Sequence, residues 1–207
     1  MKYLDINTWN RIQHFKHFNK FYDPYFGVVV EVDVTKIRLY SKKNKISFFV
    51  LYLHACMKAI NSVENLKYRI IDEKVVIHDT IHASATILRE DRTFGFTFIH
   101  YSEDFDIFYK NFQIEKDRVE NSNDLFAPIK TEDCIYCSAI PWVTFSGHKE
   151  PVSGFVESVP KVAFGKFLKK DSKLVMPISI RVNHALVDGY HIGEFFKNFQ
   201  IELDKIG

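Results

Sequence analysis

The stretch RVNHALVDGYH, residues 181–191, joins two different hydrophobic patterns. The run LVMPISIRV at 174–182, which overlaps its start, is almost continuously apolar and predicts a buried strand. After the stretch, apolar residues recur at spacings of three and four: Ile192, Phe195, Phe196, Phe199 and Leu203. That spacing predicts an amphipathic helix. His184 therefore lies where a strand ends, and Asp188 lies where a helix begins.

The residues of this junction allow two interpretations. Histidine accepts a proton near neutral pH, so His184 is a candidate general base. The simpler interpretation is a hydrogen-bonded core histidine, followed by Asp188 as an ordinary helix cap and Gly189 in a tight turn. Spacing alone favours the simpler interpretation.

The rest of the chain predicts strands interspersed with helices. Further strand-like runs occupy residues 27–35, 74–79, 82–88, 93–101, 134–140 and 161–168. Residues 47–63 and 102–122 read as two more helices, with Ser47 as the N-cap of the first. This order predicts a mixed sheet covered by helices, in the α/β or α+β class. No linker or repeat divides the sequence, which favours a single domain spanning residues 1–207.

Composition and charge narrow the class of ligand. Lys and Arg total 28 and Asp and Glu 26, so the formal charge of +2 gives no reason to expect nucleic acid or an anionic membrane as partner. No run approaches the roughly 18 apolar residues of a membrane span, and the N-terminus lacks the apolar core of a signal peptide. We therefore expect a cytoplasmic protein that binds a small molecule. The phosphate-binding glycine motifs, the zinc motif H-E-x-x-H and the nucleophile motif G-x-S-x-G are all missing.

The cysteines predict neither a disulfide framework nor a metal site. There are three, Cys56, Cys134 and Cys137, and the last two form a C-x-x-C within a predicted strand. Residues three apart in a strand point to opposite faces. Buried structural thiols are therefore favoured over a redox or metal pair.

Three motifs resemble the chloramphenicol acetyltransferase family. HALVDGYH at 184–191 is similar to its C-terminal H-x-x-x-D-G signature, which also resembles one in dihydrolipoyl acyltransferase cores and in peptide-synthetase condensation domains. WNRIQHF at 9–15 and CSAIPWVTF at 137–145 resemble two further family motifs, in the same order and at about the same spacing. The resemblance covers essentially the whole chain. It implies a two-layer sandwich, with a mixed sheet covered on one side by helices.

The resemblance assigns roles to four residues of these motifs. His184 corresponds to the general base, which takes a proton from the acceptor hydroxyl as its oxygen attacks the thioester of acetyl-CoA. Ser138 corresponds to the serine that donates a hydrogen bond to the oxyanion. Asp188 and Arg11 correspond to a structural pair, in which a guanidinium stabilises a buried carboxylate. Without the resemblance, Ser138 is an ordinary strand serine and Arg11 a surface residue.

The resemblance also implies where coenzyme A binds and how the chains assemble. Trp142 corresponds to a tryptophan beside the coenzyme channel, Phe167 to an aromatic residue near the adenine, and Lys166 could approach a phosphate. Ordinary strand positions remain the alternative for Lys166 and Phe167. Family members are trimers whose active sites lie at subunit interfaces. The cosubstrate is acetyl-CoA, and no metal is implied.

The expected acceptor pocket departs from the family pattern. Phe18 stands where a tyrosine is typical, whereas Phe94 resembles an aromatic wall of the pocket. His148 and Glu150 fall near the place of apolar pocket residues, and such polar groups suit a nitroaryl acceptor poorly. Three functions thus remain open: acetylation of chloramphenicol or a related xenobiotic, acyl transfer to a different alcohol or thiol, and a trimeric binding protein without turnover.

Overall fold

The fold is built on one large mixed sheet. The computed structural model describes residues 1–151 and 157–207. The strands of the large sheet run in the order β2-β10-β8-β7-β5-β6, with β9 paired to β10. Their bounds are β2 Tyr25–Asp33, β5 His82–Leu88, β6 Phe94–Phe96, β7 Cys134–Ile140, β8 Lys161–Gly165, β9 Leu168–Lys170 and β10 Lys173–Asn183. The pairs β5/β7 and β7/β8 are parallel and the others are antiparallel, which confirms the predicted mixed sheet.

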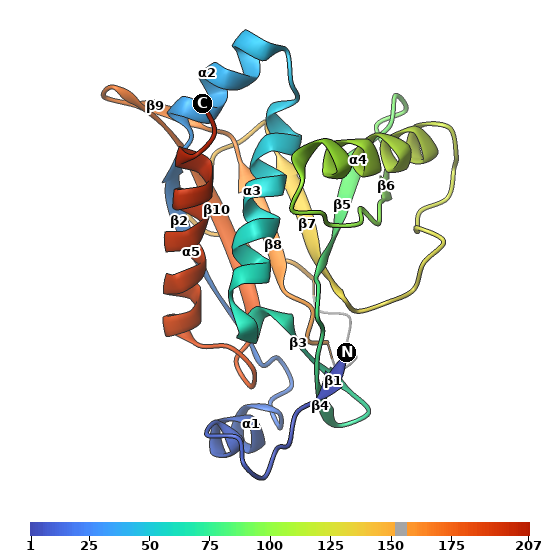
Figure 1. Cartoon of the computed structure of the whole chain (residues 1–207), viewed down its shortest axis with the longest axis vertical. Coiled ribbons are helices and arrows are strands. Elements are labelled where there is room, and N and C mark those ends of the chain that lie inside the picture. Colours follow the sequence, from blue (N-terminus) through green and yellow to red (C-terminus); the bar gives the residue numbers. More distant parts are fainter. Residues whose placement is uncertain (152–156) are drawn as a thin grey trace.

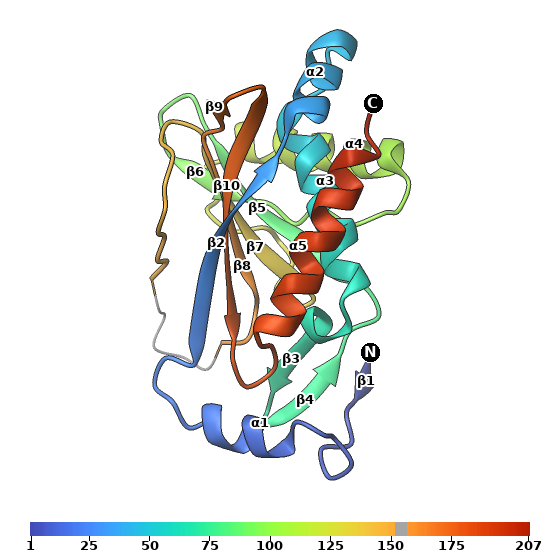
Figure 2. The same cartoon turned by 90° about the vertical axis from the view of Figure 1, so that its left-hand side faces the viewer.

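Helices cover one face of this sheet (Figures 1 and 2). They are α2 Thr35–Asn44, α3 Phe48–Ser62, α4 Phe105–Glu120 and α5 Gly189–Asp204. Alternate residues of β10, Ile178, Ile180 and Val182, are fully buried against them in the main core. Two-layer packing with helices on one side is therefore confirmed.

Smaller elements close the lower end of the sheet in Figure 1. They are a three-stranded sheet of β1 Lys2–Tyr3, β4 Lys74–Ile77 and β3 Tyr68–Ile71, the short helix η1 Glu64–Lys67, and helix α1 Ile12–Phe18. Helix α1 lies below the point where β10 turns into α5 (Figure 1). This is where the N-terminal segment meets the junction that contains His184.

The face of the sheet away from the helices is partly covered by residues 141–151, which run along it in Figure 2. Arg181 Nη1 donates to the carbonyl oxygen of Glu150 (3.0 Å), and Lys161 Nζ donates to that of Pro151 (3.3 Å). Tyr25 OH donates to the carbonyl oxygen of Val159 (2.9 Å). We call this face, defined by the outward side chains of β2, β10, β8, β7, β5 and β6, the open face.

Several predicted boundaries are wrong. Residues 93–101 form a strand only at Phe94–Phe96, and 161–168 is divided between β8 and β9. The helix expected from residue 102 starts at Phe105 with Asp104 as its cap, and Ser47 occupies an N-cap position without a side-chain cap bond. Helices α1 and α2 were not predicted, because one is only seven residues long and the other buries little apart from Ile37 and Ser41.

The three cysteines are free and buried, as predicted. Cys137 belongs to the main core under the helices, whereas Cys134 packs with Phe98 and Val159 in a separate small cluster. The two side chains of the C-x-x-C therefore point to opposite faces. In residues 1–151 and 157–207, no helix has the length and apolar character needed to cross a bilayer.

Candidate active site

A tight turn after β10 positions His184. The buried Asn183 organises it: its carbonyl oxygen accepts from the backbone N–H groups of Leu186 and Val187 (both 3.0 Å), and its Oδ1 accepts from that of Ala185 (2.9 Å). Asn183 Nδ2 also donates to the carbonyl oxygen of Glu157 (3.0 Å). Asparagine suits such a turn because its side chain can bond the backbone two residues ahead. The residue before His184 therefore fixes the shape of the junction.

The turn orients the imidazole of His184 and selects its tautomer. Nδ1 lies 3.0 Å from the carbonyl oxygen of Val187. A carbonyl can only accept, so Nδ1 carries the proton, and in the neutral ring the lone pair is on Nε2. The ring stacks on Phe18 (centroids 4.0 Å apart, planes at 16°) and contacts Phe26 (4.4 Å). His184 is thus held in a fixed orientation, with the lone pair of the neutral ring on Nε2.

Arg11 and Asp188 form the ion pair expected from the motifs. Arg11 Nη1 binds the Asp188 carboxylate, and its Nη2 donates to the carbonyl oxygen of His184 (3.4 Å). Asp188 Oδ1 also accepts from the backbone N–H of Tyr190 (3.1 Å), capping α5. Burial alone would raise the pKa of Asp188, but the neighbouring His191 and Arg11 outweigh burial and lower it. The carboxylate is therefore charged at neutral pH.

Ser138 lies on the open face, far from His184 of the same chain. In the sheet register Ser138 is opposite Ala163 and Ala163 is opposite Ser179, which precedes His184 by five residues along the chain. At about 3.3 Å per residue and about 4.8 Å per strand, His184 and Ser138 are on the order of 19 Å apart. One chain alone does not bring the two predicted catalytic residues together.

The residues expected to bind coenzyme A gather at the other end of the sheet. The backbone N–H of Lys166 donates to the carbonyl oxygen of Val143 (2.9 Å), next to Trp142, which is 64% exposed. Phe167 packs edge-on against Phe48, with ring centroids 5.8 Å apart. Trp142 and Lys166 are exposed and Phe167 is partly buried, and all three lie beyond Ser138 and not beside His184.

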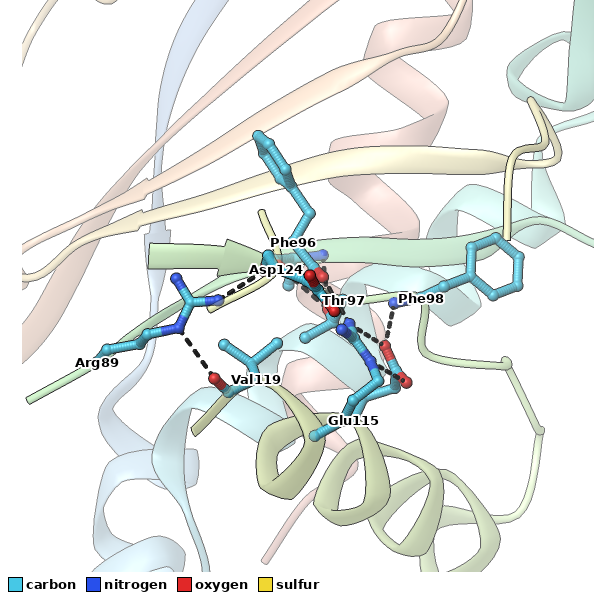
Figure 3. A network of polar contacts seen from close by, with 9 residues as sticks. Arg89, Phe96, Thr97, Phe98, Glu115, Val119 and Asp124 are labelled. Carbon is cyan, nitrogen blue, oxygen red and sulfur yellow. Dashed lines mark hydrogen bonds and ion pairs between the residues drawn. The ribbon is translucent and has the colours of Figure 1, made fainter. Parts of the chain in front are cut away.

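Of the expected acceptor residues, Phe94 is held on the edge strand β6. Glu115 and Arg118 of α4 bind backbone groups at the end of this strand and directly after it. Phe98 N–H donates to Glu115 Oε2 (2.7 Å), and Arg118 Nη2 donates to the carbonyl oxygen of Phe96 (2.7 Å). Figure 3 shows how Glu115 reaches the strand. A helix thus supplies hydrogen bonds that a further strand would normally supply at this edge. The ladder to β5 is interrupted at Thr97, whose Oγ1 accepts from the Ala85 backbone N–H (3.0 Å), and the strand ends there.

Arg89, which directly follows β5, also holds this edge strand in place. Its guanidinium donates to the carbonyl oxygens of Phe94 (2.8 Å), Val119 (2.9 Å) and Asp124 (2.6 Å). Figure 3 shows the side chain directed toward the last two. The half-exposed ring of Phe94 is therefore presented on a fixed backbone.

His148 and Glu150 lie in the segment that crosses the open face. His148 lies 5.5 Å from the ring of Phe145, which packs over Gly165. Burial raises the pKa of Glu150, and the neighbouring His148 and Lys161 oppose the increase. Both residues thus lie on the same face as Ser138, whereas Phe18 lies behind His184.

The predicted residues accordingly form two groups in one chain. His184, Asp188, Arg11 and Phe18 meet at the lower end of the sheet in Figure 1, and the others lie on the open face or beyond its upper end. Within the ranges 1–151 and 157–207, no three His, Cys, Asp or Glu side chains are grouped so that they could bind a metal ion.

Comparison with known proteins identifies the family. The chloramphenicol acetyltransferase family profile matches residues 1–200. The chain belongs to this family. It is 25% identical to chloramphenicol acetyltransferase 3 of Escherichia coli, over 95% of this chain and 94% of that protein. It is 27% identical to a chloramphenicol acetyltransferase of Bacillus pumilus, over 94% and 89%. The family assignment makes the chain an acetyltransferase.

Solved structures agree with the family assignment. A chloramphenicol acetyltransferase superposes with a TM-score of 0.89 at 29% identity, covering 98% of this chain and 99% of that one. A probable dihydrolipoamide acetyltransferase of Listeria monocytogenes has a TM-score of 0.68 at 14% identity, covering 95% and 90%. The second likeness shows a shared fold alone.

Sequence reasoning missed several residues around the site. Phe26 contacts the His184 ring, and the backbone of Val187 fixes its tautomer. The alternation in β2 could have indicated which face Phe26 occupies, but a backbone contact leaves no signal in the sequence. Tyr136 and Lys161 lie near Ser138 on the open face, and identifying them required the strand register.

Proposed function

We propose that the protein transfers the acetyl group of acetyl-CoA to a hydroxyl group of a small molecule. The observation that carries the proposal is the hydrogen bond between His184 Nδ1 and the Val187 carbonyl oxygen, which leaves Nε2 as the proton acceptor. Nε2 takes the proton of the acceptor hydroxyl while its oxygen bonds to the thioester carbon. The oxyanion accepts a hydrogen bond from Ser138 Oγ. Its collapse expels the thiolate of coenzyme A, which takes the proton back from Nε2.

The active site of this mechanism requires a second copy of the chain. His184 and Ser138 are too far apart in one chain to act on one substrate, which supports a homotrimer with His184 of one copy facing Ser138 of the next. Trp142, Lys166 and Phe167 then bind coenzyme A on the same chain as Ser138. A closed ring repeats the same pairing at every interface. The whole chain, residues 1–207, acts as one domain of this assembly.

We take chloramphenicol as the first acceptor to test, because both bacterial relatives are chloramphenicol acetyltransferases. Phe94, His148 and Glu150 on the open face and Phe18 beside His184 are the proposed acceptor-binding residues. The cosubstrate is acetyl-CoA, and no metal takes part. We expect the protein to act in the cytoplasm, because its three cysteines are free thiols, as a reducing compartment favours.

The test is release of the coenzyme A thiol from acetyl-CoA by the purified protein, with chloramphenicol and a panel of other alcohols. The His184→Ala variant is the control, since it removes the base but leaves the Arg11–Asp188 pair intact. We expect at least a hundredfold loss of kcat, in line with the usual contribution of a general base of about 10²–10⁴. Release that is unaffected by this variant contradicts the mechanism. No release with any acceptor favours a trimeric binding protein.

A further inference from the structure

A cavity of about 330 Å³ lies in the helical layer, among α2, α3, the N-terminal end of α4 and the C-terminal end of α5. One side of α3 forms its floor, where Leu51, His54 and Ala55 are each at most 6% exposed. Its walls include the partly buried rings of Tyr40 and Phe105. In Figures 1 and 2 these helix ends lie around the upper half of α3, on the side of the sheet away from the open face. The cavity is therefore separate from the surface on which the proposed assembly places a neighbouring copy.

His54 supplies a hydrogen-bond acceptor at the floor of this cavity. Its Nε2 lies 2.9 Å from the carbonyl oxygen of Ser102, so Nε2 carries the proton and Nδ1 of the neutral ring has the lone pair. Burial lowers the pKa of His54 and outweighs the opposing effect of this hydrogen bond, so the ring is neutral at pH 7. Within residues 1–151 and 157–207, Nδ1 has no hydrogen-bond partner, yet it is not among the unpaired polar atoms that are closed off from solvent. A ligand in the cavity can therefore donate a hydrogen bond to Nδ1.

The charged side chains at the rim of the cavity are paired with one another. Lys58 Nζ lies 3.2 Å from Glu202 Oε2 and 3.6 Å from Glu103 Oε1. Lys205 pairs with the other carboxylate oxygen of Glu202. Two cations and two carboxylates thus neutralise one another, and a charged ligand would have to compete with pairs that already exist. The rim therefore favours a neutral ligand.

The remaining lining of the cavity is apolar and aromatic. Leu51 and Ala55 form the apolar part of the floor, and the Phe105 ring lies edge-on to His54 with centroids 5.4 Å apart. Ligand cavities are typically lined in this way, with a few placed polar groups, and measure about 300–1,000 Å³. This cavity is near the lower limit, so it fits a ligand with a single ring, which would bury its faces against aromatic and aliphatic side chains.

We propose that this cavity binds a small neutral phenol, whose ring packs on Leu51, Ala55 and Phe105 and whose hydroxyl group donates to His54 Nδ1. The binding site is additional to the proposed acetyl-transfer site and does not depend on it. The hydroxyl group distinguishes the ligand from an aromatic hydrocarbon, because the hydrocarbon would cover Nδ1 without giving it a hydrogen bond. The paired rim distinguishes the phenol from aromatic acids and amines.

Titration of the purified full chain with 4-fluorophenol at pH 7, followed by the fluorine NMR signal of the ligand, tests the proposal. Fluorobenzene differs only in lacking the hydroxyl group, and we expect its Kd to be about tenfold higher, the usual cost of one lost hydrogen bond. The charged analogues 4-fluorobenzoate and 4-fluorobenzylamine should also bind more weakly than 4-fluorophenol. Ala55→Leu fills the cavity and His54→Phe removes the acceptor, so each should raise the Kd of 4-fluorophenol about tenfold or more. Leu39→Ala, next to Tyr40 in α2 but 62% exposed, is the matched control and should keep the wild-type Kd.

The outcomes separate this site from the acetyl-transfer site. The proposal is wrong if 4-fluorophenol does not bind, if fluorobenzene or a charged analogue binds as tightly, or if Ala55→Leu and His54→Phe keep the wild-type Kd. Binding that is lost in His184→Ala but kept in Ala55→Leu would place the phenol at the acetyl-transfer site and would overturn the proposal as well. A lack of thiol release from acetyl-CoA would contradict the proposed function alone. Circular dichroism checks that each variant is folded, and the use of two variants keeps the test decisive if one of them is not.

Discussion

Arg11 binds both ends of the turn that carries His184. One terminal nitrogen of its guanidinium pairs with the Asp188 carboxylate, and the other donates to the His184 carbonyl oxygen at 3.4 Å. The two residues are separated from Arg11 by 177 and 173 positions in the chain. The N-terminal segment is thereby fastened to the turn that carries His184 by a side chain that is only 9% exposed.

Two substitutions of Asp188 distinguish its ion pair with Arg11 from its role as the N-cap of α5. Asp188→Asn removes the charge but keeps a good cap, and we expect a loss of about 2 kcal/mol in the free energy of unfolding because Arg11 stays partly buried without its counterion. Asp188→Ala should lose about 1 kcal/mol more, since the cap is lost too. Urea denaturation measures both. An Asp188→Asn variant with unaltered stability and kcat would show that the pair does not support the turn.

Mixing two inactive variants tests whether the site is shared between copies. His184→Ala and Ser138→Ala each damage one half of every site. When the two are unfolded together and refolded as a mixture, a site composed of wild-type His184 and wild-type Ser138 arises at about a quarter of the interfaces of a cyclic oligomer. We therefore expect about a quarter of the wild-type activity, and far less when each variant is refolded alone. Equal activity in the mixed and separate samples would place both residues in one chain.

The stacking of the Phe18 ring on His184 leads to a further prediction. Phe18→Leu removes the ring that stacks on the imidazole at 4.0 Å, so the base becomes less well oriented. We expect kcat to fall about tenfold while KM for acetyl-CoA stays the same, because misplacement of a catalytic group costs rate more than binding. Phe21→Leu is the matched control: Phe21 also packs on Phe18, but it is half-exposed. An equal loss in both variants would indicate general damage to α1.

The hydrophobic pattern of the sequence predicted the strand and helix on either side of His184, because the residues that each element buries in the core set that pattern. Strand β10 and helix α5 each carry an apolar face that the core requires, and Asp188 between them is a standard cap. Helix α2 was missed because it buries little, and the early end of β6 was missed because it depends on the bond between the Thr97 side chain and the Ala85 N–H of another strand. Long-range polar contacts of this kind leave no periodic signal in a sequence.

The motifs predicted one contact of the candidate site but not the arrangement of the whole. They identified His184, Asp188 and Arg11 as candidates, and the predicted pairing of Arg11 with Asp188 is present in the structure. The separation of His184 from Ser138 and the position of Tyr136 and Lys161 near Ser138 depend on strand register. Register is set by pairing between segments far apart in the chain, so no local pattern contains it.

The support of β6 by α4 can be tested through Glu115. Glu115→Gln weakens its bonds to Arg118 and to the Phe98 N–H, and we expect a loss of about 1–2 kcal/mol in the free energy of unfolding. Because Phe94 is held on the same strand, KM for the acceptor should rise while KM for acetyl-CoA does not. Glu120→Gln, which disrupts a pair with Lys116 on the same helix, is the control. A rise in both KM values would exclude a specific effect on the acceptor.

We expect the protein to lose stability in mild acid, because burial disfavours the protonated form of several histidines. Burial lowers the pKa of His54, His78 and His82 from the ordinary value of 6.5, so the unfolded chain binds more protons than the folded one as the pH falls below about 6.5. Above that pH the three histidines are neutral in both states, and their full contribution to the free energy of unfolding is present. This contribution is lost as the pH falls through the lowered pKa values. Each additional proton adds a slope of at most about 1.4 kcal/mol per pH unit.

Urea denaturation between pH 8 and pH 5 measures this slope. His54→Gln should flatten it, because glutamine can still donate to the Ser102 carbonyl oxygen that His54 Nε2 binds at 2.9 Å but takes up no proton. His14→Gln, at an exposed position, should leave the slope unchanged. The explanation is wrong if stability is constant from pH 7 to pH 5, or if the two variants alter the slope equally, since only a buried imidazole differs in proton uptake between the folded and unfolded chains.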